Sequence, residues 1–166
     1  IFFFAQNIDK AVQAYKGGNY VDAAIRFYEV LNYEEDPSLV AEAEYGLASS
    51  LEKTELYLSS FKYYAIIVQE GSDHPFFAKA VEGLLDVGDA LKDDKFVPEI
   101  LDSIYDNNHN ALKRLTGDIL PRVHYSIGEL LFRRKDYNVS KDFLKSIREG
   151  SSVYPHAQYL IGLQYA

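Results

Sequence analysis

Apolar residues recur at three- and four-residue spacing along most of the chain, and glycine and proline stand largely at the junctions between these stretches. Such spacing places apolar side chains on one face of an α-helix. Ile8 and Ala11 share a face before Gly17-Gly18, and Ala23 and Phe27 share another after it. Because glycine readily adopts the conformation that ends a helix, the pattern predicts a helix, a glycine turn and a second helix.

The helix-turn-helix pattern recurs further along the chain. The segments Pro121 to Gly128 and Pro155 to Gly162 carry proline, tyrosine, isoleucine and glycine at the same offsets, 34 residues apart. Random composition seldom produces such a match in a chain with 5 prolines. A period in the mid-thirties is typical of stacked helical hairpins rather than of a closed globule. The sequence therefore predicts an all-α repeat fold.

Three further features resemble the tetratricopeptide repeat (TPR) family. Small residues stand where paired helices would cross, an aromatic residue opens each second helix, and proline separates the units. The small residues are Ala11, Ala23, Ala48, Ser60, Gly128, Ser140 and Gly162, the aromatic residues are Tyr20, Tyr57, Phe96 and Tyr137, and the prolines are Pro37, Pro75, Pro121 and Pro155. The resemblance covers nearly the whole chain. It implies a right-handed α-solenoid of helix-turn-helix repeats, in which small side chains let helix axes approach.

We expect a single array over residues 1–166. Its units are 5–36, 38–72, 76–118, 121–152 and a partial unit at 155–166. The third unit is irregular because 46 residues separate Pro75 from Pro121, and an extra short helix is expected near Ala111 to Leu115. The side chains of Asn107 to Asn110 compete for backbone hydrogen bonds, so we expect a bend or bulge there that divides the array into two stacks.

The ends of the chain suggest a piece of a longer protein, since methionine is absent and the last residues continue an apolar helical pattern. Ile1 to Ala5 either begin the first helix, packed against an upstream unit, or are the remnant of a secretory signal. In the first case Phe2 to Phe4 and Leu160 to Tyr165 should expose apolar surface. The Tyr154-Pro155 junction and units of about 37 residues resemble TPR proteins of bacterial cell envelopes. That resemblance implies a periplasmic or outer-membrane-associated location, with the cytoplasm as the alternative.

Composition excludes several classes of partner and chemistry. The 17 Lys and Arg residues against 25 Asp and Glu residues give a formal net charge of −8, so a nucleic-acid backbone is a poor partner. The absence of cysteine removes disulfides, thiolate zinc sites and cysteine nucleophiles. The longest apolar stretches are far short of the roughly 18 residues that a membrane-spanning helix needs, so no membrane insertion is predicted for this segment.

The candidate catalytic and metal-binding residues form no convincing site. The four histidines lie in different units and form no pair that a metal would bridge on one helix face; they are His74, His109, His124 and His156. Glu82, Asp86, Asp89 and Asp93 are spaced to form one acidic stripe on a helix, interpreted as a solvated face, with a docking surface for a basic partner as the alternative. A hydrolase that uses this stripe is disfavoured because no second functional group lies nearby in sequence. We predict no metal, no cofactor and no enzymatic activity.

Aromatic residues are frequent, with 14 tyrosines and 10 phenylalanines. In the TPR family the inner face of the first helices forms a concave groove, and the resemblance places nine side chains there. They are Tyr15, Tyr45, Glu52, Lys53, Tyr125, Glu129, Phe132, Arg133 and Tyr159. Tyrosine supplies rigid amphipathic contact area, although packing between units is the alternative role for each aromatic ring. The resemblance thus implies a non-catalytic scaffold that binds protein or peptide segments, and the alternative is a structural self-association module that forms a homo-oligomer.

Overall fold

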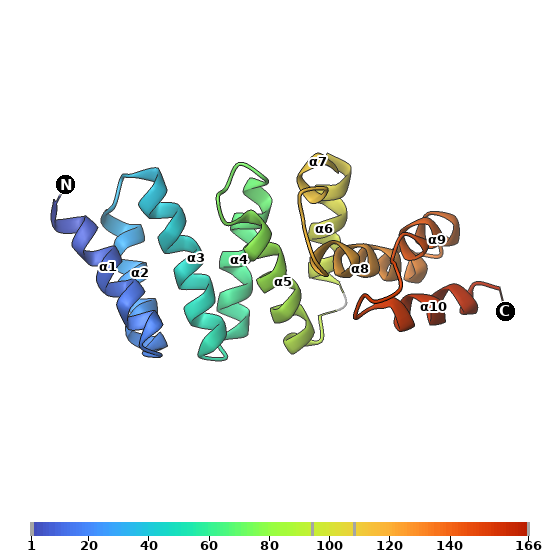
Figure 1. Ribbon diagram of the computed structural model, residues 1–166, viewed down its shortest axis with the longest axis horizontal. Helices are drawn as coiled ribbons and strands as arrows, with labels where there is room; N and C mark the ends of the chain where they lie inside the picture. Colours follow the sequence, from blue (N-terminus) through green and yellow to red (C-terminus); the bar gives the residue numbers. More distant parts are fainter. Residues whose placement is uncertain (1, 94, 108, 166) are drawn as a thin grey trace. The chain divides into compact units, whose positions relative to one another are not determined.

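The computed structural model describes residues 2–93, 95–107 and 109–165, and it describes side chains from Asn7 onward except at 94 and 107–109. Within these residues the chain forms ten α-helices and no strand (Figure 1). The helices are α1 (Phe2–Lys16), α2 (Tyr20–Tyr33), α3 (Pro37–Lys53), α4 (Tyr57–Glu70), α5 (Phe77–Leu91), α6 (Phe96–Asn107), α7 (His109–Leu112), α8 (Ile119–Arg133), α9 (Tyr137–Lys145) and α10 (Tyr154–Leu163). The prediction of an all-α fold is therefore confirmed. None of the described helices is both long and apolar enough to cross a bilayer.

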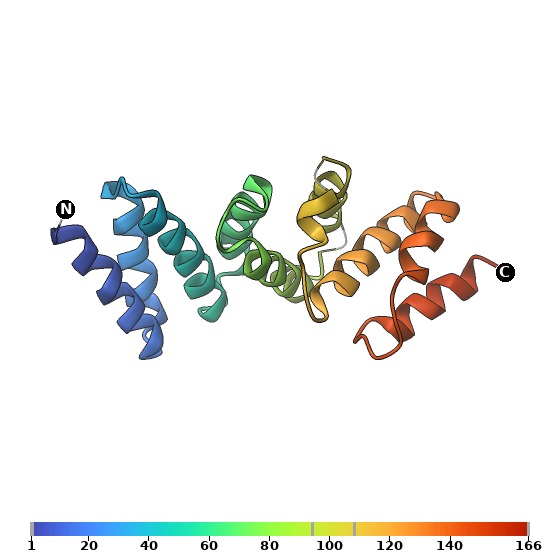
Figure 2. The ribbon, with the colours of Figure 1, turned by 45° about the horizontal axis from the view of Figure 1, so that its top comes forward.

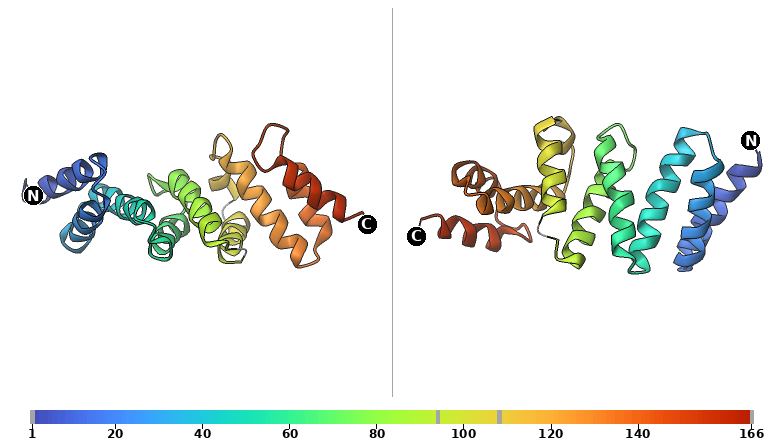
Figure 3. Two further views of the ribbon diagram at one scale, coloured as in Figure 1. Left: turned by 90° about the horizontal axis from the view of Figure 1, so that it is seen from below. Right: turned by 180° about the vertical axis from the view of Figure 1, so that it is seen from behind.

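The chain divides into two compact units, which are described separately. Unit 1 is Ile1–Leu91 and unit 2 is Lys92–Ala166. In unit 1 each helix from α1 to α5 packs against the next, and successive helices run in opposite directions (Figures 1 and 3). In unit 2 α6 packs against α7 and α8, α8 against α9, and α9 against α10 (Figure 2). Consecutive packing of this kind is compatible with a helical repeat.

Local sequence signals explain where several helices begin. The aromatic residues expected at the start of second helices are the first residues of α2, α4, α6 and α9, namely Tyr20, Tyr57, Phe96 and Tyr137. Asn19 caps α2 by accepting a hydrogen bond from the Asp22 amide, and Asp36 caps α3 by accepting one from the Ser38 amide at 2.8 Å. Hydrogen bonds from the Ser38 hydroxyl and amide also lower the pKa of Asp36. The caps satisfy amide groups that the first helical turn leaves unpaired.

Small residues lie where the helices of two hairpins cross, as expected, but the prediction is wrong for Gly162, which is exposed and has nothing within 4 Å of its Cβ position. Ala48 and Ser60 are fully buried where α3 crosses α4, and the Ser60 hydroxyl donates a 2.8 Å hydrogen bond to the Ala48 carbonyl oxygen. The Ser140 hydroxyl makes the same bond at 2.7 Å to the carbonyl oxygen of Gly128, where α8 crosses α9. Both bonds join residues twelve apart in sequence. One hairpin in each unit therefore has the same hydrogen bond at its helix crossing.

A second recurring contact joins one hairpin to the next in unit 1. A Cβ atom added at Gly46 of α3 would lie 2.4 Å from the ring of Phe27 of α2, and one added at Gly83 of α5 would lie 2.3 Å from the ring of Tyr64 of α4. The two aromatic residues are 37 positions apart, and so are the two glycines. Phe27 and Tyr64 are 2% and 1% exposed, so neither ring has room to move. Each ring therefore requires a residue without a side chain at its contact position, which is glycine.

Some expectations about the irregular region and the ends need correction. The short helix α7 spans His109–Leu112, so it begins two residues before the predicted start at Ala111. The expected bend includes residue 108, which lies outside the described residues, as do the side chains of Phe2 to Phe4. At the other end Leu163 and Tyr165 are exposed as expected, but Leu160 is buried because it packs in the core of unit 2.

We expect Gly46→Ala and Gly83→Ala each to lower the free energy of unfolding by about 1–3 kcal/mol, because the added methyl group meets an immobile buried ring. Gly162→Ala is the matched control, since its Cβ would meet nothing within 4 Å and α10 would gain about 0.5–1 kcal/mol of helix propensity. Denaturant unfolding followed by circular dichroism measures all three. Equal stability of Gly46→Ala and the native chain would contradict the ring-on-glycine contact.

Candidate functional site

The nine residues expected in a groove fall in both units and occupy different environments. Four lie in unit 1, on α1 and α3, and five lie in unit 2, on α8 and α10. In unit 1 Tyr15 and Tyr45 line a cleft of about 150 Å³ between the exposed faces of α1 and α3. Phe76, just before α5, also lines it. The two tyrosines that the sequence selected in this unit therefore lie at one surface.

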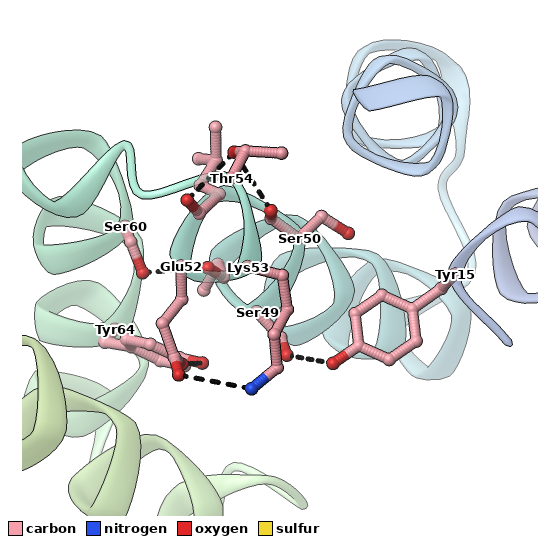
Figure 4. A network of polar contacts seen from close by, with 10 residues as sticks. Tyr15, Ser49, Ser50, Glu52, Lys53, Thr54, Ser60 and Tyr64 are labelled. Atoms are coloured by element: carbon pink, nitrogen blue, oxygen red, sulfur yellow. Dashed lines mark hydrogen bonds and ion pairs between the residues drawn. The ribbon is translucent and has the colours of Figure 1, made fainter. Parts of the chain in front are cut away.

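Tyr15 is fixed in place from two sides. Its hydroxyl group lies 2.6 Å from the hydroxyl of Ser49, which is buried on α3 (Figure 4). Its ring packs edge to face against Tyr20 of α2, with the ring centroids 5.2 Å apart. Edge-to-face pairs are favourable because the positive edge of one ring meets the negative face of the other. The half-buried Tyr15 ring therefore presents a preorganised surface to the cleft.

Tyr45 lines the same cleft from α3. Its ring stacks on Phe76 with a centroid distance of 4.9 Å and an angle of 3° between the planes. The ammonium group of Lys79 lies 5.7 Å from the centroids of both rings, within cation–π range. Burial, followed by the nearby Tyr15 and Glu52, raises the pKa of Tyr45, so the phenol stays neutral well above physiological pH. We call Tyr15, Tyr45 and Phe76 the aromatic shelf.

The charged residues beside the shelf are engaged within the fold. The hydroxyl of Tyr64 donates a 2.7 Å hydrogen bond to the Glu52 carboxylate, and the Lys53 ammonium lies 3.6 Å from the same carboxylate (Figure 4). Burial, together with the hydrogen bond to the Glu52 carboxylate, raises the pKa of Tyr64. Glu52 therefore anchors the buried tyrosine that rests on Gly83, and Lys53 is the more exposed of the two charged groups.

In unit 2 two of the selected aromatic rings serve packing. Tyr125 and Phe132 both contact the core formed by Leu144, Ile147, Ala157 and Leu160. The Tyr125 ring also lies edge to face against His156 at 6.1 Å, and the Phe132 ring against Tyr137 at 5.5 Å. Glu129 is half-buried, and Arg133 and Tyr159 are exposed. Tyr125 and Phe132 therefore pack within unit 2, whereas the ring of Tyr159 lies at the surface.

A pocket of about 750 Å³ in unit 2 brings serine and histidine side chains together. The hydroxyl of Ser146 donates its proton to the Phe143 carbonyl oxygen at 2.6 Å, so the His124 Nδ1 atom, also 2.6 Å away, must donate to that hydroxyl. A histidine in that role cannot take the serine proton, which nucleophilic activation requires. Although burial opposes it, hydrogen bonds from Ser151 and Ser152 hold the pKa of Asp118 below its usual range. The bonds between Asp118 and Ser152 join the loop before α8 to the loop before α10. Ser146, the serine that contacts His124, is not activated as a nucleophile.

The acidic stripe is shorter than the sequence suggests. Glu82, Asp86 and Asp89 lie on α5, but α5 ends at Leu91. Asp93 instead caps the start of α6, where its carboxylate accepts hydrogen bonds from the Phe96 amide at 3.1 Å and the Val97 amide at 2.6 Å. The prediction of one helical stripe through Asp93 is wrong because a short acidic side chain can satisfy the free amides at a helix start.

Sequence reasoning also missed a buried histidine cluster in unit 1. Glu44, Glu70 and His74 place ligand atoms within 4.8 Å of one another, a distance at which they could hold a metal ion. Glu44 comes from α3, so no sequence spacing reveals it. The His74 Nδ1 atom accepts a hydrogen bond from the Phe76 amide at 3.1 Å, which leaves the proton on Nε2, 3.2 Å from the Glu44 carboxylate. A metal at Nε2 needs a lone pair there, so this hydrogen-bond pattern disfavours metal binding.

We expect excess Zn²⁺ to leave the melting temperature of the native protein unchanged. A metal on His74 Nε2 would move the imidazole proton to Nδ1, where it would face the N–H group of Phe76 instead of accepting its hydrogen bond. His74→Ala serves as the control, and it should melt lower with and without Zn²⁺ because a buried hydrogen-bonded side chain is lost. Differential scanning fluorimetry measures both proteins. A zinc-dependent rise that disappears in His74→Ala would establish a metal site and contradict the expectation.

No protein-family model matches the chain, and no curated protein matches it either.

Proposed function

We propose that the chain is a non-catalytic protein-binding scaffold, and that its helical pairs form a right-handed TPR-like solenoid. The observation that carries the proposal is the aromatic shelf of unit 1, in which α1, α3 and the residue before α5 each contribute one partly exposed ring to a single cleft. The 37-residue spacing of both ring-on-glycine contacts supports a repeated hairpin. TPR proteins of bacterial envelopes remain the proposed relatives, with a periplasmic or outer-membrane-associated location or, alternatively, a cytoplasmic one.

The geometry of the shelf suits recognition of a protein segment. Tyr15 is held by Ser49 and Tyr20, and Tyr45 is held by Phe76, so little side-chain entropy remains to be lost on binding. Such preorganised aromatic rings are the side chains that most often dominate binding energy at interfaces. Lys79 adds a cation beside the rings, where it can orient an acidic or aromatic side chain of the bound segment.

The alternative proposal is self-association through exposed apolar side chains. It differs from the first in one measurable property, since self-assembly makes the average mass rise with protein concentration. Light scattering over a hundredfold range of concentration separates the two. A constant mass favours the scaffold proposal, and a rising mass favours the oligomerisation module.

We expect Tyr45→Ala to weaken binding of a shelf ligand by about tenfold or more while lowering the melting temperature only slightly, because the ring is half-buried at a surface. The ligands are peptides selected against the native protein from a displayed random library, and fluorescence anisotropy gives their affinities. Tyr33→Ala is the matched control, since Tyr33 is 69% exposed at the end of α2 and does not line the cleft. Unchanged affinity with a large loss of stability in Tyr45→Ala would assign this ring to the core and remove the shelf from the proposal.

A further inference from the structure

The second helices of unit 1 expose apolar side chains in a regular row. On α2, Val21, Ile25 and Tyr28 are 61%, 55% and 52% exposed. Their spacing of four and three residues places them on one face of the helix. Helix α2 already packs against both α1 and α3, so this row is left over after α2 has made its contacts with its neighbours in sequence. Contiguous exposed apolar surface of this kind marks interaction sites.

A matching row on α4 completes a groove. Leu56 precedes α4 and is 55% exposed, and the half-buried Tyr63 lies seven residues further on the same side of the helix. Between the two rows lies a groove of about 530 Å³, whose floor includes Leu47 and Leu51 of α3. We call it the α2/α4 groove; its full lining is Val21, Ala24, Ile25, Tyr28, Glu29, Leu47, Leu51, Thr54, Leu56, Ser59 and Tyr63. Helices α2 and α4 run in the same direction (Figure 1), so the two rows of side chains are parallel.

The groove fits a helix better than an extended strand. An extended peptide leaves backbone amide and carbonyl groups unpaired, and a sheet edge would be needed to satisfy them. The described part of unit 1 contains helices and no strand, so its backbone groups are already paired within α2, α3 and α4. A docking helix satisfies its own backbone and offers a ridge of side chains at i, i+3 or i+4 and i+7, which matches the spacing of Val21, Ile25 and Tyr28.

Negative charge is concentrated where α2 and α4 end, beyond Glu29 and Tyr63, the last residues of these helices that line the groove. Helices α2 and α4 both end without a basic residue in the last turn, and their carboxyl ends carry partial negative charge. Glu34 and Glu35 follow α2, and Glu70 is the last residue of α4. Glu29 lines the groove itself. A ligand with positive charge at that end is therefore favoured.

The net charge of unit 1 also favours a basic ligand. Unit 1 contains 15 Asp and Glu residues against 6 Lys and Arg residues, a formal net charge of −9, whereas unit 2 contains 10 against 11. Arg26 of α2 is paired with Asp22 at 2.7 Å, and the described residues that line the groove include Glu29 but no Lys or Arg. A second copy of this chain would bring the same carboxylates to the interface, and like charges placed opposite each other disfavour that pairing.

We propose that the α2/α4 groove binds an amphipathic helix of another protein, with apolar residues at i, i+3 or i+4 and i+7 and with Lys or Arg at the end that lies over the carboxyl ends of α2 and α4. The surface is separate from the aromatic shelf, because α3 presents Gly46 and Ser49 to the shelf cleft and Leu47 and Leu51 to the groove. One unit would thereby hold two ligands of different chemistry.

The test uses a displayed library of helical peptides of about 14 residues, the length of α2 and α4, as the probe. The apolar positions vary among Leu, Ile, Val and Phe, and the terminal positions vary among Lys, Arg, Glu, Asp and Gln. Selection against the full chain should enrich peptides with Lys or Arg at one end and an unbroken apolar row. Recovery of no binder, or enrichment of Glu and Asp at both ends, would overturn the proposal.

Matched variants then locate the binding surface. Ile25→Glu should lower the affinity for the selected peptides by about tenfold or more, because it places a charge in the apolar row. Leu58→Glu is the control, since Leu58 is 70% exposed on α4 but does not line the groove, and its affinity should stay within about twofold. Both residues are exposed, so both variants should fold, which circular dichroism checks. Equal weakening by the two variants would overturn the proposal.

Two further measurements separate this proposal from the alternatives. Tyr45→Ala should leave the affinity for groove peptides unchanged, and a loss there would assign those peptides to the aromatic shelf instead. Sedimentation velocity of the native chain should give a mass independent of concentration. A concentration-dependent dimer that Ile25→Glu dissociates would show that a second copy occupies the groove and would overturn the proposal of a basic partner.

Discussion

An aromatic ring seated on a glycine holds successive hairpins of unit 1 in register. Phe27 of one hairpin meets Gly46 of the next, and Tyr64 repeats the relation with Gly83, 37 residues later. A large ring can approach a helix axis this closely only where no side chain stands in the way, so the contact fixes both the distance and the rotation of the neighbouring helix. The hydrogen bond from Tyr64 to Glu52 fixes the ring further, because a buried hydroxyl without a partner would be costly.

This register decides which residues reach the surface. With Gly46 turned toward Phe27, α3 has Ser49 positioned to meet Tyr15 and has Tyr45 positioned to stack on Phe76. The same rotation directs Leu47 and Leu51 toward α2 and α4, where they form the floor of the apolar groove. One helix therefore supports two surfaces, and a change at its glycine would be expected to disturb both. The stability of the repeat and the placement of its candidate sites depend on the same contact.

Much of the helical pattern could be predicted from the sequence because it follows from local chemistry. The turn at Gly17-Gly18, the cap at Asp36 and the aromatic residue that opens α4 are encoded within a few positions of where they act. Asp93 was misassigned for a physical reason: helical spacing and helix capping favour the same short acidic residue, and only the observed end of α5 separates them.

The candidate surfaces were harder to predict. Helical periodicity shows which residues share a face of a helix, but it does not show whether another helix covers that face. Val21, Ile25 and Tyr28 have the spacing of a core stripe, and nothing in the sequence distinguishes them from Ala23, Phe27 and Val30, which are buried on the same helix. The exposed and buried rows differ only in which neighbour they meet, and that depends on how α2 is rotated against α1 and α3. The histidine cluster has the same origin, because Glu44 and His74 are brought together by packing across 30 residues of chain.

Charge is the property that most clearly distinguishes the two units. The net charge of −8 for the whole chain conceals a strongly acidic unit 1 and a nearly balanced unit 2, so the argument from charge against phosphate-backbone partners belongs chiefly to unit 1. Within unit 1 the two candidate surfaces differ as well. The aromatic shelf has Lys79 over its rings, whereas the groove ends among carboxylates and the carboxyl ends of two helices. Because electrostatic complementarity selects partners and sets their orientation, these surfaces should discriminate between ligands even though both are largely apolar.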